Sequence, residues 1–257
     1  MPAPSGTGAR SRTDGPEMLL RGFRRRTGKP ASELVGLFRS IITQGRRFHP
    51  RAGSVLEHFL DGGGASRTLP VRWVRSFRVV RKAERRNQRR FERQILREAE
   101  RLDDGASAWV HDYWDARINA VIGTELFYVS RMSLLRSEGS FVLTRTGPRV
   151  RVSGTVRHHW ADLYDWDRGR WVYIPRHGFV PIAVGRDLVE ADEARDFLME
   201  AHHVQVLEGT CVDARWPRRR KAAFTWTPTG EPDDNAGASH DRGAAEGSDS
   251  EDAEGKD

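Results

Sequence analysis

The chain has one cysteine, Cys211, and no long apolar run, and each of these shortages excludes a class of protein. A single cysteine cannot form an internal disulfide or a cysteine-rich zinc site, so the fold has to be stabilised by buried apolar surface. A helix that spans a bilayer needs about 20 consecutive apolar residues, and no run approaches that length. The first 12 residues are polar and lack a hydrophobic signal core. We therefore expect neither a membrane span nor classical secretion.

The net charge of +7 is the sum of two unlike parts of the chain. Residues 231 to 257 carry ten acidic and two basic side chains, whereas residues 1 to 230 carry 41 basic and 26 acidic ones. The acidic tail has no aromatic residue and no Ile, Leu or Val, so it has too little apolar surface to offset the entropy of ordering. We expect a disordered tail that either solvates the chain or lies over its basic body.

The composition and periodicity divide the chain into four expected regions. Residues 1 to 29 form a poorly ordered leader, residues 30 to 135 a helical region, residues 136 to 230 a mainly β region with the candidate catalytic residues, and residues 231 to 257 the tail. The expected class is α+β: N-terminal helices followed by a mainly antiparallel sheet or partly open barrel with one packed helix.

Apolar spacing predicts four helices in the first half. The first follows Pro30 and ends at Gly45, and the second runs from Arg51 to Asp61. A long helix is predicted from Leu69 to Leu102, and an aromatic-rich helix from Ala108 toward Ile122. Residues 67 to 101 contain thirteen basic and four acidic side chains, which indicates either a phosphate-bearing partner or simply a solvated face.

Beyond Gly139 the apolar period changes from helical to alternating. A hairpin is predicted around Thr146, Gly147 and Pro148, with further strands at 171–174, 179–184, 204–207 and 223–226. Leu188 to Ala201 has helical spacing and predicts a helix against the sheet.

The segment from Gly154 to Gly178 is the richest in chemically active side chains. Asp162 and Asp165 converge if the two residues between them form a tight turn, and paired carboxylates favour an oxygen-ligated cation such as Mg²⁺. His177 is the expected general acid or base. The expected holders of an anionic substrate are Arg157, Arg168, Arg170 and Arg176. A purely structural alternative has the aspartates capping their own turn while Trp160, Trp166 and Trp171 fill the core.

Two histidine pairs and the lone cysteine are further candidates for a site. Because neighbours in a strand point to opposite faces, at most one member of His158–His159 and one of His202–His203 can enter a shared metal site. Cys211 is expected to pack as a small apolar side chain.

The same region resembles the catalytic domain of colicin M-type bacteriocins. The resemblance is carried by residues 137 to 141, by Gly154, Val156 and Arg157, and by the Asp-x-Tyr-Asp motif of Asp162, Tyr164 and Asp165. It implies that helices precede a mainly β catalytic domain. It also implies that this domain cleaves lipid II between undecaprenol and pyrophosphate, with Mg²⁺ as the cofactor. The family's His-Arg pair after the second aspartate is absent here, and the nearest substitute is the reversed pair Arg176 and His177.

These observations lead to three expectations about function. The first is a toxin-like, Mg²⁺-dependent phosphodiesterase with an immunity protein as partner, made in the cytoplasm and exported without a signal peptide to a target periplasm. The second is a non-catalytic module that binds nucleic acid or another polyanion through the Arg-rich helix. The third is an adaptor or cargo component of a secretion or phage-like particle.

Overall fold

The computed structural model describes residues 30–166, 171–174, 178–181, 183–212 and 221–229. The expected leader and acidic tail, together with Arg168, Arg170, Arg176 and His177, lie outside the described residues. The helices are α2 (Ala31–Phe48), α3 (Pro50–Asp61), α4 (Val71–Ser76), α5 (Arg78–Arg101), α6 (Glu125–Val129) and α7 (Ala183–Glu190). The strands are β1 (Arg67–Thr68), β2 (Ser107–Asn119), β3 (Met132–Thr146), β4 (Arg149–Tyr164), β5 (Trp171–Ile174), β6 (Gly178–Pro181), β7 (Phe197–Val212) and β8 (Lys221–Pro228).

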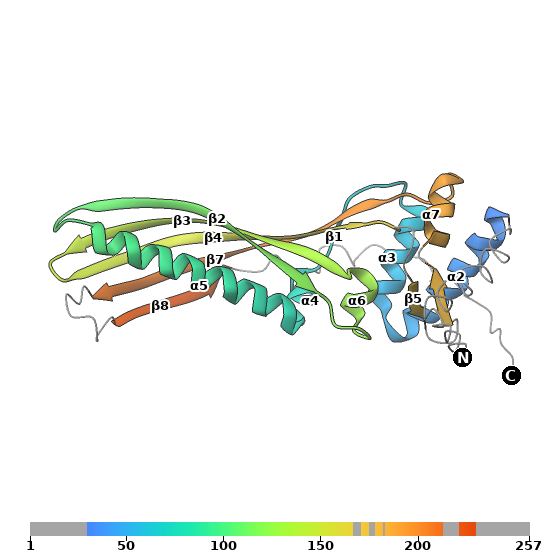
Figure 1. The fold of residues 1–257 in the computed structure, drawn as a ribbon, viewed down its shortest axis with the longest axis horizontal. Helices are drawn as coiled ribbons and strands as arrows, with labels where there is room; N and C mark the ends of the chain where they lie inside the picture. Colours follow the sequence, from blue (N-terminus) through green and yellow to red (C-terminus); the bar gives the residue numbers. More distant parts are fainter. Residues whose placement is uncertain (1–29, 167–170, 175–177, 182, 213–220, 230–257) are drawn as a thin grey trace, which may run out of the picture.

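One long sheet forms the body of the protein, in the order β1-β7-β4-β3-β2, and β8 also pairs with β7 (Figure 1). All of its pairings are antiparallel except the short one between β1 and β7. β1 and β8 pair with different parts of β7, at Met199 and Glu200 and at residues 205 to 212 respectively. β5 and β6 form a separate hairpin.

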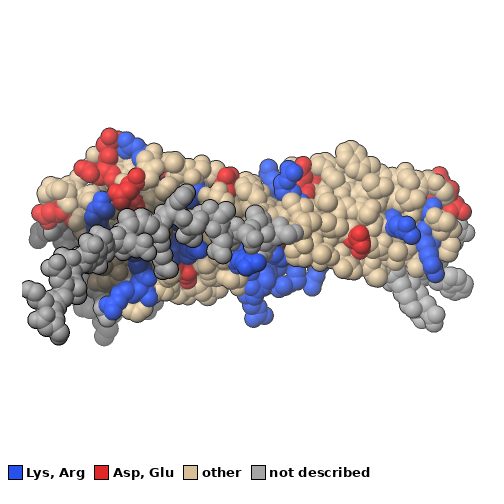
Figure 2. Space-filling model, turned by 180° about the vertical axis from the view of Figure 1, so that it is seen from behind, with Lys and Arg blue, Asp and Glu red and all other residues tan. Residues whose placement is uncertain are grey.

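The two faces of the long sheet differ in what covers them. Helix α5 lies along the face that carries the buried residues of β2 and β3, while α2, α3, α6 and α7 gather at one end of the sheet (Figure 1). The other face, here called the open face, carries the side chains that alternate with the buried ones, including the exposed Trp109 and Tyr113. Seen from the side opposite α5, much of the surface is neither acidic nor basic (Figure 2).

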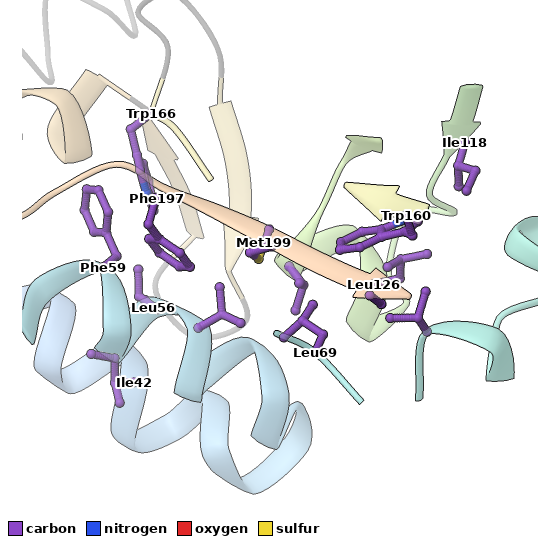
Figure 3. Packing of buried hydrophobic residues seen from close by; sticks show 14 of the residues in the cluster. Ile42, Leu56, Phe59, Leu69, Ile118, Leu126, Trp160, Trp166, Phe197 and Met199 are labelled. Carbon is purple, nitrogen blue, oxygen red and sulfur yellow. The ribbon is translucent and has the colours of Figure 1, made fainter. Parts of the chain in front are cut away.

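Two apolar clusters stabilise the fold. The larger one joins α2, α3, α4, α6 and α7 to β4 and β7 through residues such as Phe59, Trp160, Phe197 and Met199 (Figure 3). The smaller one lies between α5 and the far part of the sheet, around Phe91 and Phe141. Both clusters use β4 and β7, so the helical end and the sheet are parts of one packed body.

The α+β class is confirmed, and the sheet is open, not a closed barrel. The predicted helices after Pro30 and near Arg51 are present as α2 and α3, although α2 continues past Gly45 to Phe48. The predicted hairpin is also present: β3 and β4 pair from Leu134–Ala161 to Thr146–Arg149, and Gly147 turns the chain with φ +58°.

The predicted helix from Ala108 to Ile122 is wrong, because residues 107 to 119 form strand β2. Along β2, Val110, Ala116 and Ile118 are buried at even positions, while Trp109 and Tyr113 are exposed at odd ones. Aromatic and β-branched residues pack well in a pleated sheet, and pairing with β3 along the whole strand outweighs the helical spacing of the aromatics.

The predicted helix from Leu69 to Leu102 is divided at Phe77, whose backbone is extended. The Phe77 ring packs edge-on against Trp73, with centroids 5.0 Å apart. The guanidinium of Arg81 donates hydrogen bonds to the carbonyls of Arg75 and Ser76, which the end of α4 leaves free. The break therefore depends on contacts that the apolar spacing does not reveal.

The predicted helix from Leu188 to Ala201 is also wrong. Helix α7 ends at Glu190, and Asp192 has a φ of +68°, a left-handed conformation that ends the helical path. Residues 197 to 201 belong to β7, where Phe197, Met199 and Ala201 are buried on alternate positions. Within the described residues, every helix is too short or too polar to cross a membrane.

Candidate functional site

The Asp-x-Tyr-Asp segment lines a cavity of about 420 Å³ at the helical end of the sheet. β3 and β4 are paired only from Ala161 onward toward the hairpin, so the last residues of β4 pair with β7 alone. The cavity lies beside this unpaired edge. Its walls come from α2, α3 and the residue between them (Ile41, Gln44, Gly45, Phe48, His49, Ala52, Gly53, Leu56), α6 (Phe127, Tyr128, Val129), the first residue of β3 and the one before it (Met132, Arg131), the end of β4 and the residues after it (Asp162, Leu163, Tyr164, Asp165, Trp166), and β5 (Val172, Ile174).

The helical wall depends on a close approach of α2 and α3. A Cβ atom on Gly53 would lie 3.0 Å from the backbone nitrogen of Arg46 and 3.2 Å from the carbonyl oxygen of Ile42. Glycine at this position therefore lets the two helices meet and present Phe48 and Leu56 to the cavity. Pro50 occupies the first turn of α3, where a missing backbone N–H costs little.

Asp162 is a partly buried carboxyl group in a mainly apolar setting. Burial raises its pKa to about 7, and the negative charge of Asp165 adds to the shift. The hydroxyl of Ser130 and the backbone N–H of Leu163 act in the opposite direction. At neutral pH the group is therefore divided between its acid and its ionised form, in a cavity also lined by the exposed Asp165 and Arg131.

Tyr164 belongs to the aromatic wall of the cavity. Its ring lies 5.7 Å from that of Phe59, 5.2 Å from that of Phe197 and 6.2 Å from that of Trp166, measured between centroids. Burial raises the pKa of its hydroxyl above the ordinary value, so the phenol stays protonated. This position fits a hydrogen-bond donor or a packing side chain, not a base.

The structure brings together three of the expected site residues and separates a fourth. Asp162, Tyr164 and Asp165 line one cavity, but the tight turn expected between the two aspartates is wrong, because Leu163 and Tyr164 belong to β4 and pair with β7. Arg157 lies five residues from Asp162 on β4, at an exposed odd position that points to the open face, and does not line the cavity. His177, Arg168, Arg170 and Arg176 lie outside the described residues.

The cavity walls from α2, α3 and α6, and from the residues next to them, do not follow from the sequence pattern. Arg131, His49 and Tyr128 reach the cavity from segments that are distant in sequence from the motif. No local signal marks them, because their apolar neighbours have the spacing of ordinary core helices. Trp166, a core residue in the structural alternative, is buried and also lines the cavity.

The histidine pairs divide between the two faces, as strand geometry predicts. His158 and His203 are paired across β4 and β7 on the buried side, with stacked rings 4.6 Å apart. There His158 contacts Ser137 and Gln205, and burial lowers its pKa to about 4. His203 lies 3.2 Å from Glu84 of α5.

Glu84 is the acidic member of this buried network. Burial alone would raise its pKa, but the contact with His203 and the charge of Arg75 outweigh that effect and hold the pKa below its usual range. Arg75 donates to Glu84 across 3.1 Å. The network fixes α5 against the sheet through charged and polar groups.

The outer side of α5 is the second candidate site. Nine basic side chains along this helix are exposed, and we call them the α5 basic face: Arg78, Arg81, Lys82, Arg85, Arg86, Arg89, Arg93, Arg97 and Arg101. The four acidic residues of α5 offset only part of this charge: Glu84 is buried, Glu92 accepts a hydrogen bond from Trp226, Glu98 pairs with Arg101, and Glu100 is exposed.

Comparison with known proteins adds no relative. No protein-family model matches the chain, and neither a curated protein nor a solved structure matches it. The resemblance to colicin M-type bacteriocins therefore stays a prediction from the short motif.

Proposed function

We propose that the cavity is the active site of a metal-assisted phosphodiesterase that acts on a lipid-linked pyrophosphate. The observation that carries this proposal is that Asp162, Tyr164 and Asp165 line one cavity whose other walls are largely apolar. Ligand sites commonly combine an apolar cavity of a few hundred Å³ with a few polar groups. The resemblance of the motif to colicin M-type enzymes supports the same reaction.

The composition of the walls supports an amphiphilic substrate. Phe48, Leu56, Phe127 and Ile174 suit a hydrocarbon chain, which gains free energy on leaving water. Arg131 lies in the same lining as the two aspartates and suits a phosphate group. The substrate's phosphates would then lie beside the carboxylates while its lipid occupies the apolar part.

The donor atoms fit Mg²⁺. This ion is usually held by one or two carboxylates together with substrate phosphates and water, and Asp162 and Asp165 provide two carboxylates in one lining. When bound, Mg²⁺ neutralises phosphate charge and lowers the pKa of water. We assign the holding of the ion to Asp162 and Asp165, the holding of the phosphate to Arg131, and the shaping of the wall to Tyr164.

The proposed step is a hydrolysis. The oxygen of water forms a bond to the lipid-proximal phosphorus, and the bond from that phosphorus to the prenol oxygen breaks. The prenol oxygen takes a proton, so the products are a free prenol and a pyrophosphate-linked saccharide. We assign the proton donor to His177, whose place lies outside the described residues.

The test is incubation of the full chain with lipid II and Mg²⁺, followed by chromatography of the released prenol. We expect release by the wild type, and a loss of about a hundredfold or more in Asp165→Asn because one carboxylate ligand is removed. Asp61→Asn, which removes an exposed carboxylate paired with Arg39, should leave the rate unchanged. No release by the wild type, or equal release by Asp165→Asn, would sink the proposal.

A second candidate function, polyanion binding, is favoured by the α5 basic face. Arg81, Arg85, Arg89, Arg93, Arg97 and Arg101 follow one another at intervals of four residues. Like charges at this spacing destabilise a helix by about 0.2 to 0.5 kcal/mol per pair. An anionic partner would relieve this repulsion. Its phosphates would also release their counterions on binding, which favours the complex.

For this second function we expect binding to a DNA duplex of about two helical turns to weaken steeply as salt rises. The triple variant Arg85→Gln, Arg89→Gln, Arg93→Gln should lower both the affinity and the slope of its dependence on salt. The matched control changes the same number of charges on the open face: Arg149→Gln, Arg151→Gln and Arg157→Gln. Equal effects of the two variants, measured by fluorescence anisotropy, would argue against a role for α5.

The acidic tail provides a further variant for the same measurement. Deleting residues 231 to 257 removes a net charge of −8. We expect tighter binding of the duplex at low salt, because the tail competes with the polyanion for the basic body. Unchanged affinity would leave the tail as a solvating segment.

A further inference from the structure

The open face of the β4–β7 pair brings two histidines and a glutamate together. His159 of β4 lies directly opposite His202 of β7, and Glu200 is two residues from His202 on the same strand. Residues at this spacing project from the same face of a sheet. The three side chains are therefore neighbours because of the register of two central strands.

The ligand atoms are close enough to share one ion. One ring nitrogen from each histidine and a carboxylate oxygen of Glu200 all lie within 4.8 Å of one another. The Nε2 atom of His159 is 3.1 Å from Glu200 Oε1, and that of His202 is 3.8 Å from Glu200 Oε2. Atoms bound tetrahedrally to Zn²⁺ at about 2.1 Å are about 3.4 Å apart, so small side-chain rotations suffice.

The imidazole rings need one such rotation. They are stacked with centroids 4.2 Å apart and an angle of 17° between their planes. The χ2 torsion of histidine is broad, so the rings are free to turn while their backbone stays in place. The backbone beneath them is held by the β4–β7 ladder and by a 2.7 Å hydrogen bond from the Leu69 N–H to the Glu200 carbonyl.

We propose that His159, Glu200 and His202 form a binding site for a divalent transition metal, with Zn²⁺ as the representative ion. Two imidazole nitrogens and one carboxylate favour Zn²⁺, Co²⁺ or Ni²⁺ over Mg²⁺ and Ca²⁺, which prefer oxygen ligands alone. All three side chains are partly or well exposed, so a fourth position faces solvent and accepts water or a ligand group from a partner.

This site is separate from the cavity and does not depend on the proposed hydrolysis. Asp162 and Tyr164 occupy even positions of β4 and point to the cavity side, whereas His159 occupies an odd position and points to the open face. The first site offers oxygen ligands and the second mainly nitrogen ligands. The two are therefore expected to differ in the metals that they select.

The experiment titrates the full chain with ZnCl₂ in competition with a chromophoric chelator. We expect one saturable site in the wild type, and affinity reduced by about tenfold or more in His159→Ala and in His202→Ala. Cobalt substitution should give visible absorption bands of a nitrogen-ligated ion. In the wild type, zinc should protect His159 and His202 from diethylpyrocarbonate, as read by mass spectrometry, which tests the site without a mutation.

The matched control is His111→Ala, on the same open face. His111 lies 3.4 Å from Glu138 and is not a member of the group formed by His159, Glu200 and His202. Its loss should therefore leave zinc affinity unchanged. The proposal is overturned by a wild type that lacks saturable zinc binding, or by equal affinities in the His159→Ala, His202→Ala and His111→Ala variants. Absence of protection at both histidines in zinc-saturated protein would overturn it as well.

Discussion

At pH 8 and without divalent cations, Asp162→Asn is expected to be more stable than the wild type by up to about 4 kcal/mol. The reason is the partly buried carboxyl group in the cavity, whose pKa is raised to about 7 in the folded protein. In the unfolded chain the pKa of an aspartate is about 3.9, and each unit of difference corresponds to about 1.4 kcal/mol. Asparagine resembles the neutral acid and avoids the cost of a buried charge.

The difference between the two proteins should depend on pH in a defined direction. Between about pH 4 and pH 7 the folded wild type binds more protons at Asp162 than the unfolded chain, so its free energy of unfolding falls as pH rises. Below pH 4 the carboxyl group is neutral in both states, and the wild type and Asp162→Asn should have nearly equal stability.

Urea unfolding at pH 4 and pH 8, followed by circular dichroism, measures this difference. Asp61→Asn is the control, because its carboxylate is exposed and paired with Arg39, and its effect should stay within about 0.5 kcal/mol. If Asp162→Asn changes stability equally at both pH values, the carboxyl group is not desolvated in the way described. A residue that costs stability at neutral pH is typical of a site kept for binding or catalysis.

Glu84→Ala is expected to destabilise the protein by about 3 kcal/mol, because it leaves Arg75 and His203 without their buried acidic partner. Glu84 is only 4% exposed, so solvent cannot replace the lost interactions. The change leaves the apolar contacts of α5 with the sheet and the hydrogen bonds of Asn87 and Gln88 in place, so it should lower the unfolding midpoint without changing its steepness.

Glu98→Ala tests whether the loss of stability in Glu84→Ala comes from the buried contacts of Glu84 or simply from removing one negative charge from α5. Glu98 lies on the same helix and pairs with Arg101, but that arginine side chain is 74% exposed. Exposed pairs contribute about 0.5 kcal/mol or less, so this variant should be nearly neutral. Equal losses in Glu84→Ala and Glu98→Ala would contradict a structural role for the buried network.

The sequence predicts elements well where one local period is dominant. Helices α2 and α3, and the β3–β4 hairpin around Gly147, follow from local spacing and turn chemistry. Strand β2 does not, because Trp109, Tyr113 and Trp114 also fit a helical stripe. Its pairing with β3 decides the outcome, and such pairing is a long-range property that composition does not contain.

In the candidate sites, too, some features follow from a short segment of sequence and others depend on the pairing of distant strands. Asp162, Tyr164 and Asp165 are close in sequence, so their meeting in one cavity follows from a short segment. The opposite orientation of neighbouring histidines also follows from strand geometry. The pairing of His159 with His202 depends on the register between β4 and β7, which are separated by more than thirty residues of chain. Glu200 was missed for the same reason.

Strands β4 and β7, which contribute to both apolar clusters, also affect how the molecule responds to force. β4 and β7 are each sixteen residues long and paired along their whole length, a ladder of about 54 Å. Force applied along this axis loads many hydrogen bonds in shear at once. Because β4 runs without a break from the hairpin at Arg149 to the cavity residues Asp162 and Tyr164, no loop separates the hairpin tip from the cavity wall.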